Sequence, residues 1–247
     1  MEQTANYMLP DFPKLQCPFI RADYKVNIDD WRKYGSQLEL REPKVRLVQR
    51  DIYPGYEWVF DDPDTFAVEK LNGTNIQLVT ENGRLVHVQN RLNLIDPLQI
   101  IKGKTFIIEG IFMSIQKGYI KDQGIQAGEV IGPKLQGNPY QLNTHLFYPF
   151  EKAIKDLRYN SFDEHDRTFD NWSLWFKDYL VSRYYTKLFK KDELKEKIMA
   201  EGIVFYNLKR KAQGLTYMAK LRRNMFHWYY SDKIRIGERI EETEMGK

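Results

Sequence analysis

The segment from Val68 to Val79 reads VEKLNGTNIQLV and joins two apolar, strand-like runs through a short polar turn. Lys70 ends the first run, and the turn that follows, Asn72-Gly73-Thr74-Asn75, carries amide and hydroxyl groups on both sides of a glycine. A lysine at the end of a strand is ordinarily a solvated surface residue. A glycine in a polar turn, however, lets the backbone approach an anionic ligand closely. The segment therefore fits two interpretations, a solvent-exposed turn and a turn that faces phosphate groups.

The composition is that of a folded intracellular protein. The chain has 247 residues, of which 42% are hydrophobic, so it is long enough to bury a full core. A charged fraction of 29% with a net charge of +4 is compatible with a polyanionic partner without establishing one. The single cysteine, Cys17, excludes an internal disulfide, and we do not expect it to be catalytic. We expect a reducing compartment, either the cytoplasm or, for a viral protein, the host cytoplasm.

No feature of the sequence predicts a membrane protein. No apolar run approaches the roughly eighteen residues that a membrane-spanning helix needs. The first residues, MEQTANYMLPDF, lack the basic and then apolar order of a signal peptide. We therefore expect a soluble protein without a membrane partner.

The middle of the chain has the texture of a β-sheet region. Asn82-Gly83 lies between two alternating runs, which predicts a hairpin with a type I′ turn. Three further runs, KTFIIEGIF (104–112), AGEVIGPKL (127–135) and HLFYPF (145–150), read as short strands. Together with TFAVEK (65–70), these runs indicate a sheet between residues 65 and 148.

The second half of the chain changes to helical spacing and then returns to strands. Trp172, Trp175, Phe176 and Tyr179 recur at three- and four-residue intervals ahead of the charged segment KKDELKEK (190–197), which predicts two helices. EGIVFYN (201–207) and GLTYMAKLRR (214–223) read as strands joined by the basic connector LKRKAQG, and the aromatic tail as helical. We expect an α+β fold with an N-terminal extension or opening subdomain (1–62), and a core (63–247) that contains a helical insertion at about 151–200.

The string Lys70-Leu71-Asn72-Gly73-Thr74-Asn75 resembles a known catalytic motif. Lys-x-Asn-Gly is similar to the nucleotidyl-transfer motif of ATP-dependent ligases and capping enzymes. The longer string is similar to that of bacteriophage and protist RNA ligases of the second type, with Asn72 standing where some members have His. The resemblance implies that Lys70 is the nucleophile that accepts AMP.

Further motifs of this family follow in the same order as in its members. The run VHVQNR contains Arg91, which by the resemblance contacts the RNA 5′-phosphate or the ribose. The run Gly128–Asn138, GEVIGPKLQGN, reproduces a Gly-Glu motif followed by Gly-Pro and Gln-x-Asn, and it supplies Glu129. Glu109 in FIIEGIF is a rival to Glu129, but the Gly-Pro and Gln-x-Asn elements do not follow it. We therefore prefer Glu129, as the ribose contact.

An aromatic residue that stacks on adenine is the next family element. HLFYPFEKA offers Phe150, followed by Glu151 where the family has Asp. Phe147 or Tyr148 could serve instead, and an aromatic residue in a strand is as often a core residue as a platform for a base. The assignment to Phe150 is the prediction that the order of motifs favours.

The last two motifs lie near the C-terminal end. Glu201-Gly202-Ile203-Val204 matches the family's Glu-Gly-(Ile/Val)-Val, and Lys220-Leu221-Arg222 stands where the family commonly has Lys-x-Lys. Arginine keeps the positive charge and gains a bidentate grip on phosphate, but it loses the compactness of lysine. Outside this context, the run KLRRN would read as the basic edge of a strand.

The resemblance implies a complete set of site residues. A lysine amine is almost fully protonated at neutral pH, so Lys220, Arg222 and a divalent metal near Lys70 are expected to favour the neutral amine and to neutralise phosphates. Mg²⁺ or Mn²⁺ prefers oxygen ligands, for which we assign Glu201 and, in second place, Glu129. Catalytic roles go to Lys70, Lys220 and Arg222. The nucleotide-binding set is Glu69, Asn72, Gly73, Asn75, Arg91, Glu129, Phe150, Glu201, Lys220 and Arg222.

These motifs, spread over about residues 65 to 225, predict an ATP-dependent RNA ligase that joins a 5′-phosphate to a 3′-hydroxyl. The implied fold is a nucleotidyltransferase core of two antiparallel sheets flanked by helices, with the ATP pocket between them. We expect no OB-fold, because few residues follow Arg223. The alternatives are a DNA ligase or capping-type guanylyltransferase with a partner, and a non-catalytic RNA-binding module. The tracts Lys209-Arg210-Lys211 and Arg222-Arg223, with Trp228, Tyr229 and Tyr230, could contact RNA, although a solvated turn and a packed helix explain them equally well.

Overall fold

The chain divides into two compact units that are built from interleaved segments. The computed structural model describes residues 9–96, 103–164, 166–188 and 197–241. By their contacts, unit 1 comprises residues 1–14, 71–158 and 182–198, and unit 2 comprises residues 15–70, 159–181 and 199–247. Lys70 is the last residue of a unit 2 segment and Leu71 begins a unit 1 segment, so the VEKLNGTN string crosses the division. The boundary expected near residue 62 remains a prediction.

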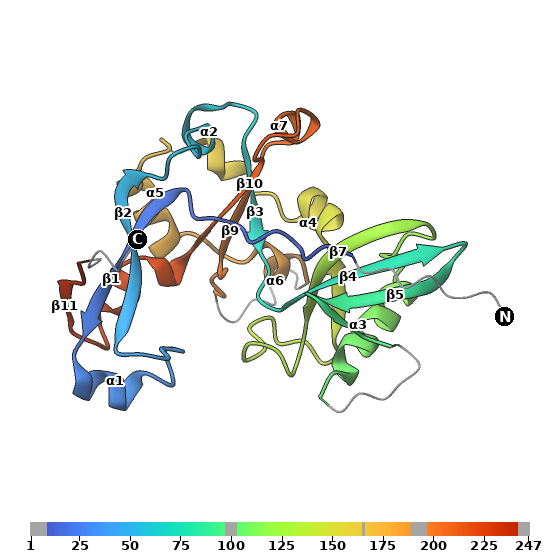
Figure 1. Cartoon of the computed structure of the whole chain (residues 1–247), viewed down its shortest axis with the longest axis horizontal. Coiled ribbons are helices and arrows are strands. Elements are labelled where there is room, and N and C mark those ends of the chain that lie inside the picture. The colour runs from blue at the N-terminus through green and yellow to red at the C-terminus, as the bar shows by residue number, and fades with distance from the viewer. Residues whose placement is uncertain (1–8, 97–102, 165, 189–196, 242–247) are drawn as a thin grey trace, which may run out of the picture. The chain divides into compact units, whose positions relative to one another are not determined.

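Unit 2 contains two three-stranded antiparallel sheets with short helices. The first sheet has the order β10-β9-β3 and the second the order β11-β1-β2 (Figure 1). The strands are β3 (Phe66–Lys70), β9 (Gly202–Tyr206), β10 (Met218–Arg222), β1 (Phe19–Val26), β2 (Lys44–Ile52) and β11 (Ile236–Arg239). The helices are α1 (Ile28–Tyr34), α2 (Trp58–Asp61), the 3-10 helix η1 (Asn160–Glu164), α5 (Phe169–Asp178), α7 (Leu208–Ala212), the 3-10 helix η3 (Arg223–Met225) and α8 (Trp228–Ser231).

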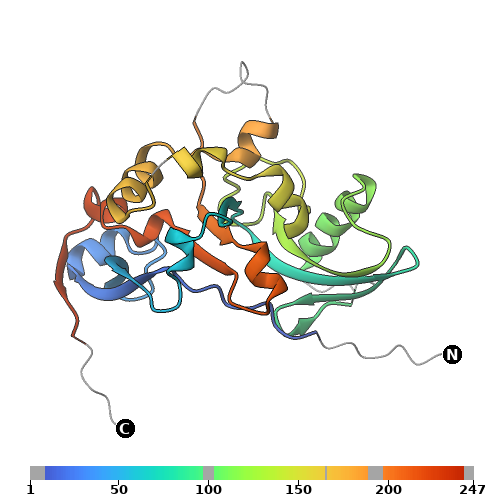
Figure 2. The ribbon, with the colours of Figure 1, turned by 90° about the horizontal axis from the view of Figure 1, so that it is seen from above.

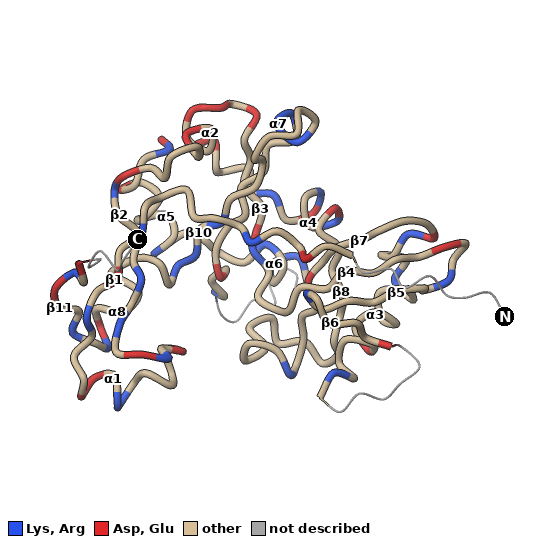
Figure 3. Tube along the Cα trace, viewed as in Figure 1, with Lys and Arg blue, Asp and Glu red and all other residues tan. Residues whose placement is uncertain are grey.

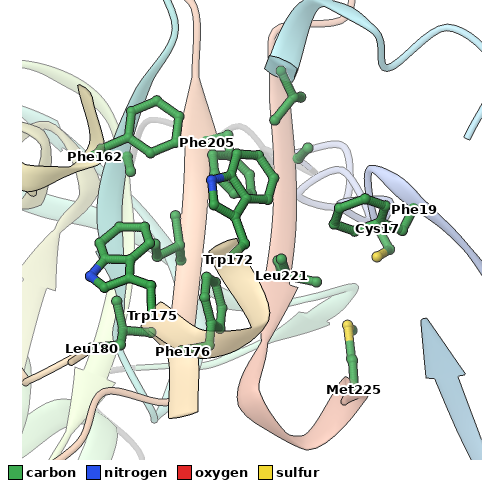
Figure 4. Close-up of a cluster of buried hydrophobic side chains, with 14 of the residues drawn as sticks. Cys17, Phe19, Phe162, Trp172, Trp175, Phe176, Leu180, Phe205, Leu221 and Met225 are labelled. Atoms are coloured by element: carbon green, nitrogen blue, oxygen red, sulfur yellow. The ribbon is translucent and has the colours of Figure 1, made fainter. Parts of the chain in front are cut away.

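The core of unit 2 confirms the predicted amphipathic helix. Helix α5 begins after Thr168, whose hydroxyl accepts the backbone N–H of Asn171 as an N-cap. Trp172, Trp175 and Phe176, three and four residues apart, are all buried. The indole of Trp172 stacks on Phe205 of the central strand β9, with ring centroids 5.0 Å apart (Figure 4). One face of the β10-β9-β3 sheet is therefore apolar and covered.

Unit 1 is built on a five-stranded antiparallel sheet of order β6-β5-β4-β7-β8. Its elements are β4 (Thr74–Glu81), β5 (Arg84–Asn90), β6 (Asn93–Leu94), α3 (Thr105–Gln116), β7 (Gly124–Ile131), β8 (Leu146–Pro149), α4 (Phe150–Asp156) and α6 (Arg183–Leu188). The predicted hairpin is confirmed: Asn82 and Gly83 join β4 to β5 with φ angles of +48° and +73°, as a type I′ turn requires. The antiparallel α+β class is likewise confirmed.

The two faces of the five-stranded sheet differ in character. Ile76, Val88 and Val130 lie in a buried cluster with Ile107 and Ile111 of helix α3, which packs on this face (Figure 2). Residues at the alternate positions of the same strands are largely polar, because successive side chains of a strand point to opposite faces. The polar face carries Asn75 of β4 and Glu129 of β7, two of the residues that the sequence assigned to nucleotide binding.

The prediction of a strand at 104–112 was wrong, because this segment begins helix α3. Ile107 and Ile111 are spaced for one helical face, and a short continuous apolar run does not distinguish the two structures by periodicity alone. Gly110 permits the close packing of this helix on the sheet. A Cβ at Gly110 would lie 3.0 Å from Val130 Cγ1 and 3.3 Å from the Leu146–Phe147 peptide.

Two smaller predictions also differ from the structure, and a third falls on residues that are not described. The connector at 208–214 contains helix α7, which begins after Asn207, whose side chain accepts the Arg210 N–H. The aromatic tail forms only the short helix α8 and then strand β11. Residues 190–196 of the charged KKDELKEK segment lie outside the described residues. None of the helices in the described part of the chain has the length and apolar character that a membrane span requires.

Candidate functional site

Three sequence motifs meet at one end of the β10-β9-β3 sheet in unit 2. Lys70 at the end of β3 and Arg222 at the end of β10 both pair in register with Gly202 at the start of β9. Residues directly opposite one another across a sheet share a face, so Lys70 and Arg222 flank a position that has no side chain. A Cβ at Gly202 would lie 2.2 Å from the Leu221 carbonyl oxygen and 2.7 Å from Arg222 Cα. Glycine is therefore required there by packing.

Glu201 is the carboxylate that these two cations share. Lys70 Nζ donates to Glu201 Oε2 at 2.7 Å, and Arg222 Nη1 lies 3.7 Å from Glu201 Oε1. The side chains of Lys70 and Glu201 are 23% and 17% exposed, so the pair is shielded from water on most sides. Arg222 Nε is buried without a hydrogen-bond partner in the described structure. An unused N–H donor beside a shared carboxylate is available to an anionic ligand.

Lys220 and Arg21 add to the positive charge at this end of unit 2. Burial lowers the pKa of Lys220, and so do the neighbouring charges of Arg222, Lys70 and Arg21, while Glu201 opposes the shift. Sequence reasoning missed Arg21, which lies on β1 and has its own pKa lowered chiefly by burial. Basic positions recur along β1, β2 and β10 (Figure 3). No local pattern marks Arg21, because a different sheet brings it near the motif lysines.

Two other residues of this part of unit 2 are buried. Glu69 alternates to the opposite face from Lys70 and is 2% exposed, so its assignment to nucleotide binding remains a prediction. Cys17 is fully buried, and burial raises the pKa of its thiol to about 11. The thiolate, the reactive form of cysteine, is therefore disfavoured, as expected for a structural residue.

The turn after Lys70 belongs to unit 1 and is fixed from within that unit. The backbone N–H of Asn72 donates to the hydroxyl of Tyr140 at 2.8 Å. A Cβ at Gly73 would lie 2.1 Å from the Val130 carbonyl oxygen, so the chain's own backbone already requires glycine here. The sequence predicted Gly73 as a point where phosphates approach the backbone, and in the structure Gly73 also allows the turn to pack against Val130. Tyr140 was not predicted.

Asn75 and Glu129 lie side by side on the polar face of the five-stranded sheet. They are directly opposite one another on β4 and β7, and Glu129 also faces Tyr148 on β8. Asn75 Nδ2 donates to the Gly128 carbonyl at 3.4 Å, whereas Asn75 Oδ1 is buried without a partner in the described structure. A buried acceptor without a partner is costly, which makes Asn75 a candidate ligand contact.

The rival glutamate has a structural role in unit 1. Glu109 lies on helix α3, and its Oε2 is 2.7 Å from Nδ1 of the buried His145. The other ring nitrogen of His145, Nε2, accepts the backbone N–H of Lys134 at 3.1 Å. At Gly132, with a φ of +144°, a Cβ would lie 2.7 Å from His145 Cα. Packing against His145 thus explains the glycine and the lysine of the Gly132-Pro133-Lys134 loop. Glu129, in contrast, lies on the polar face of the sheet, opposite Asn75.

The three aromatic candidates for stacking on a base differ in their burial and in their neighbours. Phe147 is fully buried in the cluster that packs against α3, and Tyr148 is 3% exposed with its hydroxyl donating to Asp156 at 2.7 Å. Phe150 is half-buried and begins helix α4 after strand β8, a difference from the predicted strand end. Its ring centroid lies 5.0 Å from that of Phe12. Phe150 therefore remains the candidate for stacking on a base.

Arg91 is the exposed cation of unit 1 that the motif order singled out. It follows β5 in a left-handed conformation, with a φ of +55°, and its side chain is 55% exposed. Its Nη1 lies 3.4 Å from Asp11 Oδ2. Neither Asp11 nor Phe12 was predicted, since no local pattern connects a segment near the N-terminus with residues 80 positions or more away.

The site residues thus form two sets, each assembled within one unit. Unit 2 holds the Lys70–Glu201–Arg222 cluster with Lys220, and unit 1 holds Asn72, Gly73, Asn75, Glu129, Arg91 and Phe150. No cluster of three His, Cys, Asp or Glu side chains suited to a metal ion occurs among the described residues. A protein-only metal cage is therefore not formed by the described residues.

Comparisons with known proteins found structural neighbours only. No protein-family model and no curated protein matches the sequence. The fold is similar to structures of an RNA ligase from Naegleria gruberi. A variant with ATP and Mn has 14% identity and a TM-score of 0.40 over 68% of this chain. An apo variant of the same enzyme has 15% identity and a TM-score of 0.41 over 93% of this chain. A structure of this enzyme with PPi has 13% identity and a TM-score of 0.35 over 94% of this chain. The chain spans 51% to 62% of the length of these neighbours.

Proposed function

We propose that this protein is an ATP-dependent RNA ligase that acts through a covalent lysyl-AMP. The observation that carries the proposal is the Lys70–Glu201–Arg222 cluster with Lys220, in which residues from three separate motifs gather at the end of one sheet. A solvated strand-end lysine would not require this arrangement. The order and spacing of the motifs in the sequence support the same activity.

Lys70 is the nucleophile in the proposed reaction. Its Nζ attacks the α-phosphorus of ATP, a P–N bond forms, the bond to the β-phosphate oxygen breaks, and pyrophosphate leaves. The 5′-phosphate of RNA then attacks this phosphorus and breaks the P–N bond, which frees Lys70 and forms an RNA adenylate. A 3′-hydroxyl finally attacks the 5′-phosphorus of the RNA, and AMP leaves. The sealed product is a 3′–5′ phosphodiester.

The neighbours of Lys70 carry charges of both signs. The carboxylate of Glu201 accepts a hydrogen bond from Lys70 Nζ at 2.7 Å. The positive charges of Lys220 and Arg222 would attract the triphosphate. A ligand that withdraws Glu201 from Lys70 would break this contact and leave the lysine beside the cations Lys220 and Arg222.

The donors in unit 2 fit a divalent metal that is shared with the substrate. Mg²⁺ commonly binds through one or two carboxylates plus substrate phosphates and water, so Glu201 suffices as a protein ligand although no cluster of three donors is described. When bound, Mg²⁺ or Mn²⁺ would neutralise phosphate charge at the α-phosphorus. Glu129, in unit 1, stays a proposed contact to the ribose or to the metal.

The remaining contacts are assigned to the nucleotide and the RNA. Asn75, whose Oδ1 has no hydrogen-bond partner among the described residues, is proposed to contact the nucleotide, and Phe150 to stack on adenine. Arg91 is proposed to bind the RNA 5′-phosphate. The tract at Lys209 to Lys211 is a weaker candidate for RNA contact, because Lys209 already pairs with Asp64 at 2.7 Å. The single buried cysteine is compatible with action in a reducing, intracellular compartment.

Trapping the covalent intermediate tests the proposal. Incubation with α-labelled ATP and Mg²⁺ should yield a labelled protein, and Lys70→Ala should abolish the label while the exposed control Lys25→Ala keeps it. Label that persists in Lys70→Ala would refute the assignment. Labelling by GTP in place of ATP would favour a capping enzyme, and sealing of DNA but not RNA would favour a DNA ligase. RNA binding without any adduct would favour a non-catalytic module.

A further inference from the structure

A short N-terminal segment crosses the polar face of the five-stranded sheet in unit 1. This segment, Leu9 to Phe12, is called the N-terminal strap below. The N–H of Leu9 donates to Gln89 Oε1 at 3.2 Å, and its carbonyl accepts from Gln89 Nε2 at 2.9 Å. The Pro10 carbonyl accepts from Gln77 Nε2 at 2.9 Å. Gln77 and Gln89 are directly opposite one another on β4 and β5, so the strap follows one row of the sheet.

The two glutamines attach the strap firmly to unit 1. Gln89 is fully buried, Gln77 is 7% exposed and Leu9 is 8% exposed. Detachment of the strap would leave buried amide groups without these partners, which is costly. The strap is therefore a fixed part of unit 1, and the residues that follow Pro10 have a defined position.

Beyond this attachment, the strap contacts Arg91 and Phe150, two of the substrate candidates of unit 1. Asp11 Oδ2 lies 3.4 Å from Arg91 Nη1, and the ring of Phe12 lies 5.0 Å from that of Phe150 at an angle of 47°. Asp11 Oδ1 is buried without a partner in the described structure. The fold alone gives no reason to hold a carboxylate oxygen in that state.

We propose that Asp11 and Phe12 are positioning residues of the substrate site, an inference that rests on the proposed ligase function. Phe12 fixes the plane of the Phe150 ring so that a purine base can stack on it, since aromatic pairs prefer defined geometries. Asp11 restricts the long, exposed side chain of Arg91 to an orientation that receives the 5′-phosphate of RNA. Phe12 therefore acts on nucleotide binding and Asp11 on the RNA step.

Kinetics of the two directions of lysine adenylation test Phe12. We expect Phe12→Ala to raise the KM for ATP about fivefold, the scale of one lost aromatic pair. The KM for pyrophosphate in the reverse reaction of the adenylated protein should change less, because pyrophosphate has no base to stack. Phe12→Tyr, which keeps the ring, should restore the KM for ATP. An unchanged KM for ATP, or equal losses in both directions, would overturn the role of Phe12.

Single-turnover transfer of AMP to a 5′-phosphorylated RNA tests Asp11. Asp11→Asn should slow this transfer about fivefold more than it slows lysyl-AMP formation, the scale of one charge-assisted contact. Asp51→Asn, an exposed carboxylate on β2 of unit 2, is the matched control and should change neither rate. Faster transfer or tighter RNA binding in Asp11→Asn would mean that Asp11 competes with RNA for Arg91, and would overturn the proposal.

Equilibrium binding separates this inference from the ligase proposal. If the wild-type protein forms no lysyl-AMP but binds a non-hydrolysable ATP analogue, the ligase proposal fails. Weaker binding of that analogue by Phe12→Ala than by the wild type would then still support the positioning role of Phe12. If the wild-type protein binds no ATP analogue, both proposals are overturned.

Discussion

The Lys70–Glu201 ion pair offers a quantitative prediction in which Glu201 is replaced by Gln. The substitution keeps the shape of the side chain but removes the negative charge that Lys70 and Arg222 share. At 2.7 Å the gross attraction is about 6 kcal/mol for an effective dielectric constant of about 20, and desolvation offsets most of it. Side-chain exposures of 23% and 17% place the pair between surface pairs and fully buried ones. We expect the unfolding free energy of unit 2 to fall by about 2 kcal/mol.

Tryptophan fluorescence during urea unfolding is the appropriate measurement. The chain has five tryptophans, and all of them lie in unit 2, so the signal follows that unit. A double-mutant cycle with Lys70→Met isolates the pairwise term, which we expect to be about 2 kcal/mol. A second double-mutant cycle, on the ion pair of Lys209 and Asp64, serves as the comparison. This pair has the same 2.7 Å separation, but its side chains are 73% and 42% exposed.

Comparison with the Lys209–Asp64 pair tests whether burial or the distance between the charged groups determines the coupling energy. Water and salt screen the Lys209–Asp64 pair, so its cycle should give no measurable coupling. Equal couplings for the two pairs would refute the reasoning from burial. A coupling below about 0.5 kcal/mol for Lys70 and Glu201 would place their pair among ordinary surface contacts.

Three further predictions concern individual side chains. Tyr140→Phe removes the acceptor of the Asn72 N–H and should slow lysyl-AMP formation about tenfold with little change in the KM for ATP, as measured by single-turnover labelling. Burial acts to raise the pKa of Asp156, but hydrogen bonds from two lysines and Tyr148 hold it at about 2, below the ordinary 3.8. Stability from this group is present above about pH 4 and is lost as the pH falls towards 2, so the melting temperature of Asp156→Asn should fall less over that range than that of the wild type. Burial raises the pKa of Cys17 to about 11, so its thiol should react with a disulfide reagent at pH 8 only after urea unfolding; rapid reaction of the folded protein would contradict this.

Elements whose signals are local could be predicted from the sequence. The type I′ hairpin follows from Asn82-Gly83, because these residues readily take positive φ angles. Helix α5 follows from apolar side chains at helical spacing. Helix α3 was misread, because its apolar residues at 106–108 and 111–113 form short runs that satisfy strand and helix patterns alike. In the folded chain the segment is helical, and Gly110 allows this helix to approach the sheet closely.

The candidate site likewise combines features that the sequence predicted with features that only the tertiary structure shows. The sequence by itself predicted Lys70, Glu201, Lys220 and Arg222 as site residues, because their motifs follow one another along the chain in the order of the family that they resemble. Only the tertiary structure decided that Lys70 and Arg222 flank Gly202 in register, that Glu109 holds His145, and that the N-terminal strap reaches Arg91 and Phe150. Those contacts join residues far apart in the chain, and their free energy depends on packing and burial, which no short stretch of sequence encodes.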